Sequence, residues 1–199
     1  MAERTTLLSN EEGRRVAHAD RADNDAVLVG AATVRIDDPR LTVREVPKRG
    51  ADPLRVVLSS TLVVPHGARI FDDPKRVLVI GARGRVRDDE RAWLAERGAE
   101  SAVVAATSEG LVALDDALAV LAERGVKRLL VEGGARVVTS FLRAGVADRM
   151  HVEIAMTLLG ADATPTALPL HGQMPRLANV SIERCGEHVL VRGDVCHDN

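Results

Sequence analysis

Short apolar runs alternate with amphipathic segments along most of the chain, and this alternation predicts the secondary structure. Apolar runs of strand length, bounded by glycine or polar residues, predict strands at Ala26–Val29, Leu54–Leu58, Arg76–Ile80, Ala102–Ala106, Lys127–Val131 and Arg149–Ala155. Helical spacing and capping residues predict helices at Glu11–Asp23, Asp88–Arg97, Leu114–Arg124 and about Ala135–Ala144. Asn10 or Ser9 is the expected N-cap of the first helix.

The order of these elements predicts an α/β fold. Strands that alternate with helices up to Ala144 favour a mostly parallel sheet with helices on both faces. The segments Asn179–Arg184 and His188–Arg192 are too close for a helix between them, so they predict a C-terminal antiparallel hairpin. No repeat or linker divides the chain, and we therefore predict one mixed sheet in a single domain over residues 1–199.

Composition and charge narrow the range of partners. The chain has 199 residues, 46% of them hydrophobic, and a net charge of −2, as expected for an ordinary globular protein. This balance favours neither nucleic acid nor a membrane surface, and 2% aromatic residues provide no stacking platform for single strands. No apolar run approaches the roughly 20 residues of a membrane span. Met1–Asn10 lacks an apolar leader, so we expect a cytoplasmic protein.

The cysteines and histidines predict no metal site. Cys185 and Cys196 lack the C-x-x-C spacing and are expected to be reduced thiols. The six histidines are scattered along the chain and form no metal-binding motif.

The stretch from Asp25 to Arg44, DAVLVGAATVRIDDPRLTVR, is the first candidate site. It begins as a buried strand and continues through small residues into Asp37-Asp38-Pro39, where proline disfavours further helix. Thr33 and the charged residues therefore follow the carboxyl end of a strand, which is where open α/β sheets bind ligands. The alternative is an ordinary solvated loop.

The segment Glu132-Gly133-Gly134 is the second candidate site. It joins a predicted strand to a predicted helix, and backbone amides at a helix start suit a pyrophosphate. A tight turn explains the glycine pair about as well. Glu132 favours the binding site, because a carboxylate beside an anion is useful only if it holds a ribose hydroxyl or a substrate N–H.

Two further strand ends carry polar groups. Arg83 and Arg85 in the run GARGRVR have the geometry to pair with a phosphate, such as the one that distinguishes NADP from NAD. Ser60 offers a hydroxyl after the strand Leu54–Leu58. A solvated loop and a simple turn are the respective alternatives.

Two long motifs resemble a known family. GAATVRIDDPRLTVR resembles the signature G-x-x-T-v-x-x-D-[DN]-P-x-L-x-x-R of the pyrimidine reductase domain of riboflavin biosynthesis. LLVEGGARVVTSFLRAGVADRMHVEIAMTLLG resembles the second signature of the same family, in which Glu-Gly-Gly precedes a helix. The resemblance extends from about Leu7 to Val191 and implies a dihydrofolate-reductase-like fold.

The resemblance also implies an activity. Members of this family use NADPH to reduce the ribosyl group of a 5-amino-6-ribosylamino-pyrimidinone 5′-phosphate to ribityl, with hydride delivered to the anomeric carbon of the ring-opened imine. A homodimer is implied as well. Two other hypotheses stay open: an NADPH-binding relative without activity, and a reductase of a pterin or another secondary metabolite.

The site residues of the family map onto numbered positions of this chain. The implied substrate contacts are Thr5, Arg21, Leu41, Arg44 and Glu132. The implied cofactor contacts are Thr33, Asp37, Ser60, Gly133, Gly134, Ala135, Arg136, Val137, Val138, Thr139 and Ser140, to which we add Arg83. Asp37 and Glu132 are the candidates for the catalytic centre, Asp37 by polarising the nicotinamide amide or handling a proton.

One family element has no counterpart in the sequence. Family members begin with a central strand that carries Ser-x-[DN]-Gly, whereas Met1-Ala2-Glu3 alone precedes Arg4 here. We therefore expect this strand to be missing and Thr5 to stand in for the serine that follows it.

Overall fold

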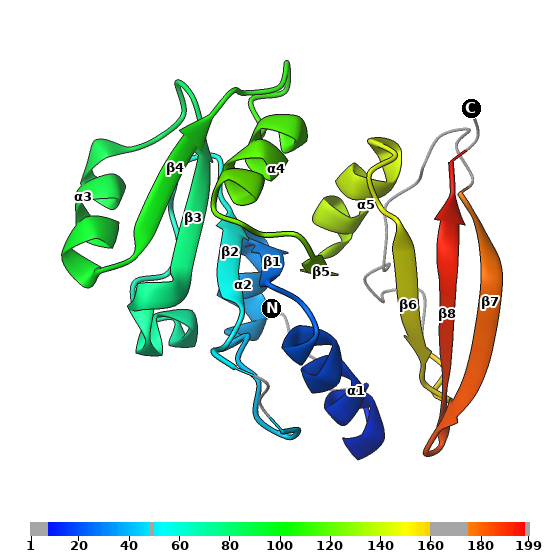
Figure 1. The fold of residues 1–199 in the computed structure, drawn as a ribbon. Coiled ribbons are helices and arrows are strands. Elements are labelled where there is room, and N and C mark those ends of the chain that lie inside the picture. The colour runs from blue at the N-terminus through cyan, green and yellow to red at the C-terminus, as the bar shows by residue number, and fades with distance from the viewer. Residues whose placement is uncertain (1–7, 48–49, 160–174, 198–199) are drawn as a thin grey trace.

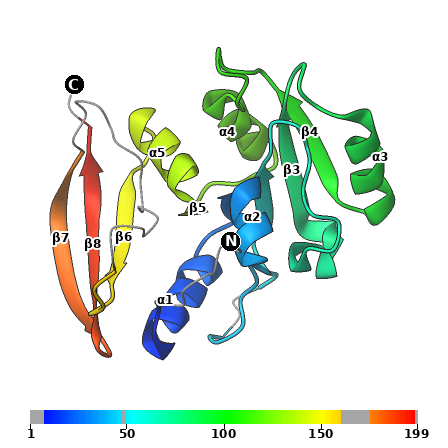
Figure 2. The same ribbon diagram turned by 180° about the vertical axis from the view of Figure 1, so that it is seen from behind.

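The computed structural model describes residues 8–47, 50–159 and 175–197. The strands form two sheets, and helices α1 (Glu11–Ala22) and α5 (Ala135–Arg143) lie between them in both views (Figures 1 and 2). Within the described ranges, every helix is too short or too polar to cross a bilayer.

The larger sheet is wholly parallel and has the strand order β4-β3-β2-β1-β5. Its strands are β1 (Ala26–Gly30), β2 (Leu54–Leu58), β3 (Val77–Ala82), β4 (Glu100–Val104) and β5 (Leu129–Gly133).

Helices cover both faces of this sheet, as predicted. Besides α1 and α5, the α-helices of the described residues are α2 (Ala31–Asp37), α3 (Asp88–Arg97) and α4 (Leu114–Glu123). Leu94 of α3 packs in a core cluster on one face, while Leu121 of α4 and Phe141 of α5 belong to a cluster on the other. Burial on both faces explains why β1 and β3 are continuous apolar runs. Two short 3-10 turns, Arg69–Asp72 and Pro74–Arg76, lead into β3.

The smaller sheet is antiparallel and has the order β6-β8-β7. It contains β6 (Arg149–Ile154) and the predicted hairpin of β7 (Arg176–Cys185) and β8 (His188–Cys196). The mixed α/β content is as predicted, but one continuous sheet is not formed. In the described residues β5 pairs with β1 and β6 pairs with β8, so their facing edges share no ladder. Hydrophobic periodicity identifies strands but does not specify their partners.

Two strands of the parallel sheet are shifted by two residues from the predicted ranges. β4 lies two residues earlier than Ala102–Ala106, because Ala106 leaves the ladder and bridges Val112. β5 lies two residues later than Lys127–Val131, because the Asp25 carboxylate accepts the amides of Lys127 and Arg128, each at 2.9 Å. These amide hydrogen bonds lower the pKa of Asp25. The shift places Glu132 inside the strand.

Helix α1 connects the two sheets. Asn10 caps it by accepting the Gly13 amide at 2.7 Å, as its sequence position predicted. Toward the smaller sheet, Ser9 donates to Glu153 at 2.6 Å, and His188 contacts the other oxygen of the same carboxylate at 2.6 Å. Asp20 pairs with His151 of β6 at 3.1 Å. Polar contacts along the helix thus hold β6 and β8 against α1.

Gly13 allows this close approach. A Cβ atom built at Gly13 would collide with the carboxyl group of Glu153. The absence of a side chain therefore lets the carboxylate reach the first turn of α1, where Ser9 and the helix amides favour its negative charge.

The Glu153 carboxylate should stabilise the fold in a pH-dependent manner. Burial raises the pKa of Glu153, but hydrogen bonds from Ser9 and His188 outweigh burial and hold that pKa below its ordinary value. A folded-state pKa below the unfolded one gives stabilisation that is complete above the ordinary carboxyl pKa of about 4.3 and is lost as the pH falls through the folded-state pKa.

We therefore expect Glu153→Gln to lower the free energy of unfolding by about 1–2 kcal/mol at neutral pH, since an amide loses both charge-assisted hydrogen bonds. The deficit relative to the wild type should shrink below about pH 4.5. Urea unfolding at both pH values measures it. The matched control is Glu183→Gln on exposed β7, which should change stability by less than about 0.5 kcal/mol. Equal losses in the two variants would contradict the assignment.

Candidate active site

The predicted site residues gather at the carboxyl edge of the parallel sheet. Thr33 and Asp37 lie on α2, which directly follows β1, and Ser60 follows β2. Arg83 follows β3, and Glu132 and Gly133 end β5. Parallel strands bring these ends to one side of the sheet, which is the usual ligand-binding side of such folds.

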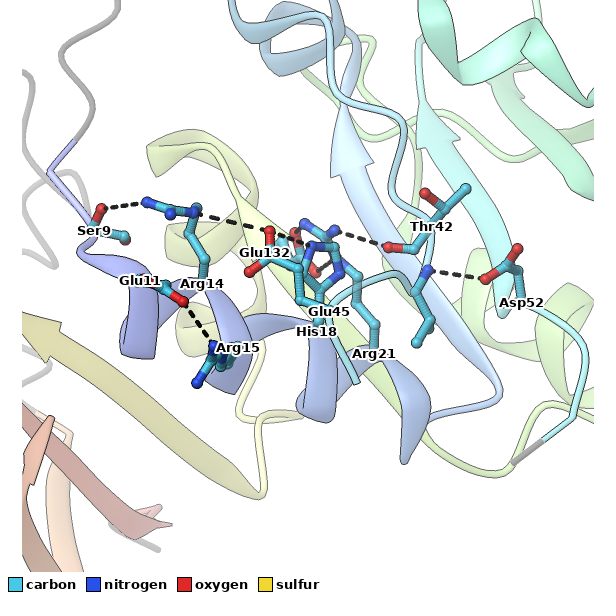
Figure 3. A network of polar contacts seen from close by, with 11 residues as sticks. Ser9, Glu11, Arg14, Arg15, His18, Arg21, Thr42, Glu45, Asp52 and Glu132 are labelled. Atoms are coloured by element: carbon cyan, nitrogen blue, oxygen red, sulfur yellow. Dashed lines mark hydrogen bonds and ion pairs between the residues drawn. The ribbon is translucent and has the colours of Figure 1, made fainter. Parts of the chain in front are cut away.

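A bidentate ion pair between Arg21 and Glu132 joins α1 to the end of β5. Arg21 donates from Nε to Glu132 Oε1 at 2.5 Å and from Nη2 to Oε2 at 2.7 Å. Its Nη1 donates to the Thr42 carbonyl at 3.2 Å, so the same guanidinium also holds the loop after α2 (Figure 3). The side chains are 13% and 20% exposed, which limits screening by water. Two residues predicted to contact substrate therefore contact each other.

The loop that follows α2 supplies the next two candidates. Leu41 is buried and has a φ of 54°, so its side chain belongs to the core and its backbone alone can face a ligand. Arg44 is exposed at the surface of this loop. The resemblance therefore fits Arg44 as a side-chain contact and Leu41 as a backbone contact.

The neighbouring carboxylates Asp37 and Asp38 have different roles. Asp38 ends α2 with a φ of 42° and accepts the Arg69 amide at 2.7 Å, while Arg69 Nε lies 3.1 Å from its Oδ2. Asp37 is the last residue of α2 and is exposed. Asp38 therefore holds Arg69, while the side chain of Asp37 is exposed at the C-terminal end of α2.

The start of α5 fits a dinucleotide phosphate. The first amides of a helix lack partners within the helix, and no side chain caps Gly134. A Cβ atom at Gly134 would lie 3.1 Å from Thr33 Oγ1, so the missing side chain keeps the space between α2 and α5 open. Thr139 and Ser140 turn their hydroxyls back to the carbonyls of Ala135 and Arg136, at 2.7 and 2.9 Å. Contacts to a cofactor from Thr139 and Ser140 would therefore come from the backbone, whereas the exposed Arg136 can offer its side chain.

Arg83 lies apart from the Arg21–Glu132 pair. It is exposed beyond β3, two strands from β1, which corresponds to roughly 10 Å across the sheet. Ser60 follows β2, the strand between β3 and β1, and its carbonyl accepts the Ala82 amide at 3.0 Å. An extended ligand is needed to reach from Gly134 to Arg83. Thr5, the remaining predicted substrate contact, lies outside the described residues.

The structure adds His18 to the site. His18 is 4% exposed and lies on the face of α1 that also carries Arg14 and Arg21. Burial lowers its pKa, and the charges of Arg21 and Arg44 lower it further. The i, i+4, i+7 spacing of these three residues was a readable signal of one helical face. His18 itself belongs to no metal-binding or catalytic motif in the sequence.

One cavity lies away from these residues. A hollow of about 690 Å³ opens at the opposite edge of the sheet, lined by the residues before β1 and β2 and by Arg76, Arg124 and Arg128. None of the predicted site residues in the described ranges borders it.

Comparison with known proteins supports the resemblance. The chain is 36% identical over 188 residues to the 2,5-diamino-6-ribosylamino-4(3H)-pyrimidinone 5′-phosphate reductase of Archaeoglobus fulgidus, covering 90% of this chain and 84% of that protein. It is 34% identical over 186 residues to the enzyme of the same name from Aquifex aeolicus, covering 94% and 80%.

The fold is shared with a solved structure, a pyrimidine reductase-like protein from Corynebacterium diphtheriae. That structure has a TM-score of 0.82 at 24% identity and is matched over 96% of this chain and 84% of its own. The dihydrofolate-reductase-like fold implied by the motifs is thus confirmed. Residues 2–191 match the RibD C-terminal domain, and the chain belongs to that family.

Proposed function

We propose that this chain is an NADPH-dependent reductase that converts the ribosyl group of a ribosylamino-pyrimidinone 5′-phosphate to ribityl. One observation carries the proposal. The end of β5 offers Glu132 to the arginine of α1 on one side, and Gly134 to Thr33 and the start of α5 on the other. A phosphorylated sugar bound at Glu132 and a dinucleotide bound at Gly134 would therefore lie next to each other, because these two residues are only two positions apart in the chain.

The cofactor side fits a nicotinamide dinucleotide, which the reductase family implies. When bound, NADPH supplies a hydride. The amides at the start of α5 would hold its pyrophosphate, and Thr33 would lie beside it across Gly134. Arg83 is placed to pair with the 2′-phosphate, at a distance that an extended dinucleotide can span. Asp37, exposed at the end of α2, would orient the nicotinamide amide or pass a proton.

The substrate side combines a fixed carboxylate with arginines. Arg21 holds Glu132 in a single orientation, which suits acceptance of an N–H or hydroxyl proton from the substrate. Arg44, exposed on the adjacent loop, would bind the 5′-phosphate through its planar guanidinium. The names of the two curated relatives favour the 2,5-diamino pyrimidinone over its deaminated analogue as the substrate.

A homodimer stays part of the proposal. Ile154 is 46% exposed and Ile182 is 70% exposed. Both share one face of the smaller sheet with Val152, Val189 and Val191 through the β6–β8–β7 pairing. A second copy that packed on this face would remove apolar surface from water.

The test is NADPH oxidation by the purified chain with each of the two pyrimidinone phosphates. Turnover with either one, and loss of the NADPH absorbance in proportion to ribityl product, is the expected result. Tight NADPH binding without turnover on both compounds would instead indicate a binding protein without activity. Turnover only with an unphosphorylated pterin would indicate a different substrate class.

Arg44→Ala should raise the KM for the phosphorylated substrate at least about tenfold, because a charge-assisted contact to phosphate contributes about 1.5–3 kcal/mol. The dephosphorylated analogue should show a KM within about twofold of that of the wild type. Arg91→Ala, an exposed arginine on α3, is the matched control and should change neither value. An equal rise in KM for both substrates would argue against a phosphate contact.

Gly134→Ala should weaken NADPH binding at least about tenfold, because the new methyl group fills the space between Thr33 and the α5 amides through which the cofactor must approach. Isothermal titration calorimetry with NADPH measures it. Gly67→Ala serves as the control, since a Cβ at that exposed position meets nothing within 4 Å. Unchanged NADPH affinity in the Gly134 variant would place the cofactor elsewhere.

A further inference from the structure

His18 is a buried polar side chain with an unpartnered nitrogen. The residue is 4% exposed, and its Nδ1 atom has no hydrogen-bond partner. The other ring nitrogen, Nε2, lies 3.9 Å from Glu45 Oε1, which is beyond hydrogen-bonding distance. Buried polar groups are nearly always paired, so an unpartnered ring nitrogen next to a ligand site points to a ligand.

The groups that face His18 carry an excess of positive charge. Arg14 and Arg21 lie on its own helix. From the loop after α2, the charge of Arg44 lowers the pKa of His18, while Glu45 and a hydrogen bond with the Thr42 backbone raise it. Arg21 directs two of its donors to Glu132, and Arg14 Nε is 3.9 Å from Glu45. Three arginines and two carboxylates thus surround this part of α1, and Arg21 already binds one of the carboxylates, Glu132.

In the free protein, this positively charged environment disfavours protonation of the His18 ring. The same environment favours binding of a dianion. Burial and the nearby Arg21 and Arg44 charges lower the pKa of His18, so the ring is neutral at neutral pH in the free protein. A phosphate dianion placed between α1 and Arg44 would reverse the local potential. The ring could then take a proton from solvent and donate an N–H to a phosphate oxygen.

We propose that His18 is a further ligand of the substrate's phosphate group, which it binds beside Arg44 while taking up a proton. The inference rests on the proposed function and deepens it, because it assigns a pH-dependent donor to the phosphate end of the substrate. By linkage, a group that gains a proton on binding makes the affinity rise as the pH falls through the pKa of the bound state.

Sulfate is the probe, because it remains a dianion from pH 6 to 8.5 and adds no titration of its own. Calorimetry at constant ionic strength should show wild-type protein binding sulfate several-fold more tightly at pH 6 than at pH 8.5, because pH 6 realises only part of the factor of ten that one unit of pKa change allows. His18→Gln, which keeps a donor but cannot be protonated, should show less than about a twofold change over the same range. His197→Gln, exposed near the C-terminus, is the matched control and should behave as wild type.

A second measurement does not depend on the variant folding. NMR titration of the His18 ring in the wild type should give a pKa that rises by about one unit when sulfate is added. An unchanged His18 pKa, or equal pH dependence of sulfate binding in wild type and His18→Gln, would overturn the proposal. Both readouts are independent of turnover, so failure of the reductase assay with a positive sulfate result would reject the proposed reaction and keep the anion site.

Discussion

The ion pair between Arg21 and Glu132 fixes the distance between α1 and the end of β5, and the geometry of the site depends on it. Two parallel donor–acceptor contacts of 2.5 and 2.7 Å define the orientation of both groups, not merely their proximity. The third contact of Arg21, to the Thr42 carbonyl, holds the loop that presents Arg44. Removing either partner would leave a partly buried charge without compensation, which is more damaging than losing the pair's net attraction.

Helix α1 extends this constraint to the smaller sheet. Its start is tied to the Glu153 carboxylate, which His188 also contacts, and to the Cys185 carbonyl, and its last turn to His151. These contacts place the smaller sheet relative to the larger one where β5 and β6 share no ladder in the described residues. The charged face of α1, with Arg14, His18 and Arg21, is thereby aimed at the strand end that carries Glu132. Fold and site are therefore held by the same helix.

Much of this arrangement was predictable from the sequence. Local signals were sufficient for the Asn10 cap, the strand Leu54–Leu58 and the break at Asp38-Pro39, because each depends on neighbours in the chain. The two long motifs identified the family and the strand ends that carry the candidate site. The division into two sheets was not predictable, since the pairing of β6 with β8 rather than β5 is decided by contacts between distant segments.

Side-chain direction was the other limit. The family resemblance implied a substrate contact at Leu41, whose side chain is in the core, and a cofactor contact at Thr139, whose hydroxyl donates to a carbonyl of its own helix. A motif specifies position but not which part of the residue faces the ligand. His18 shows the converse: its chemistry was visible, but its burial among arginines arises only when the loop after α2 folds against α1.

A crystal structure of the ternary complex with NADP+ and the ribitylamino-pyrimidinone 5′-phosphate product tests the central claim most directly. The account predicts that the cofactor pyrophosphate lies beside Thr33 and the start of α5 and that the nicotinamide lies near Asp37. It also predicts that the product phosphate contacts Arg44 and His18 on the far side of Glu132. A product phosphate bound at the opposite edge of the sheet, or a nicotinamide more than about 6 Å from the ribityl chain, would contradict it, because hydride transfer requires reacting atoms about 3–3.5 Å apart.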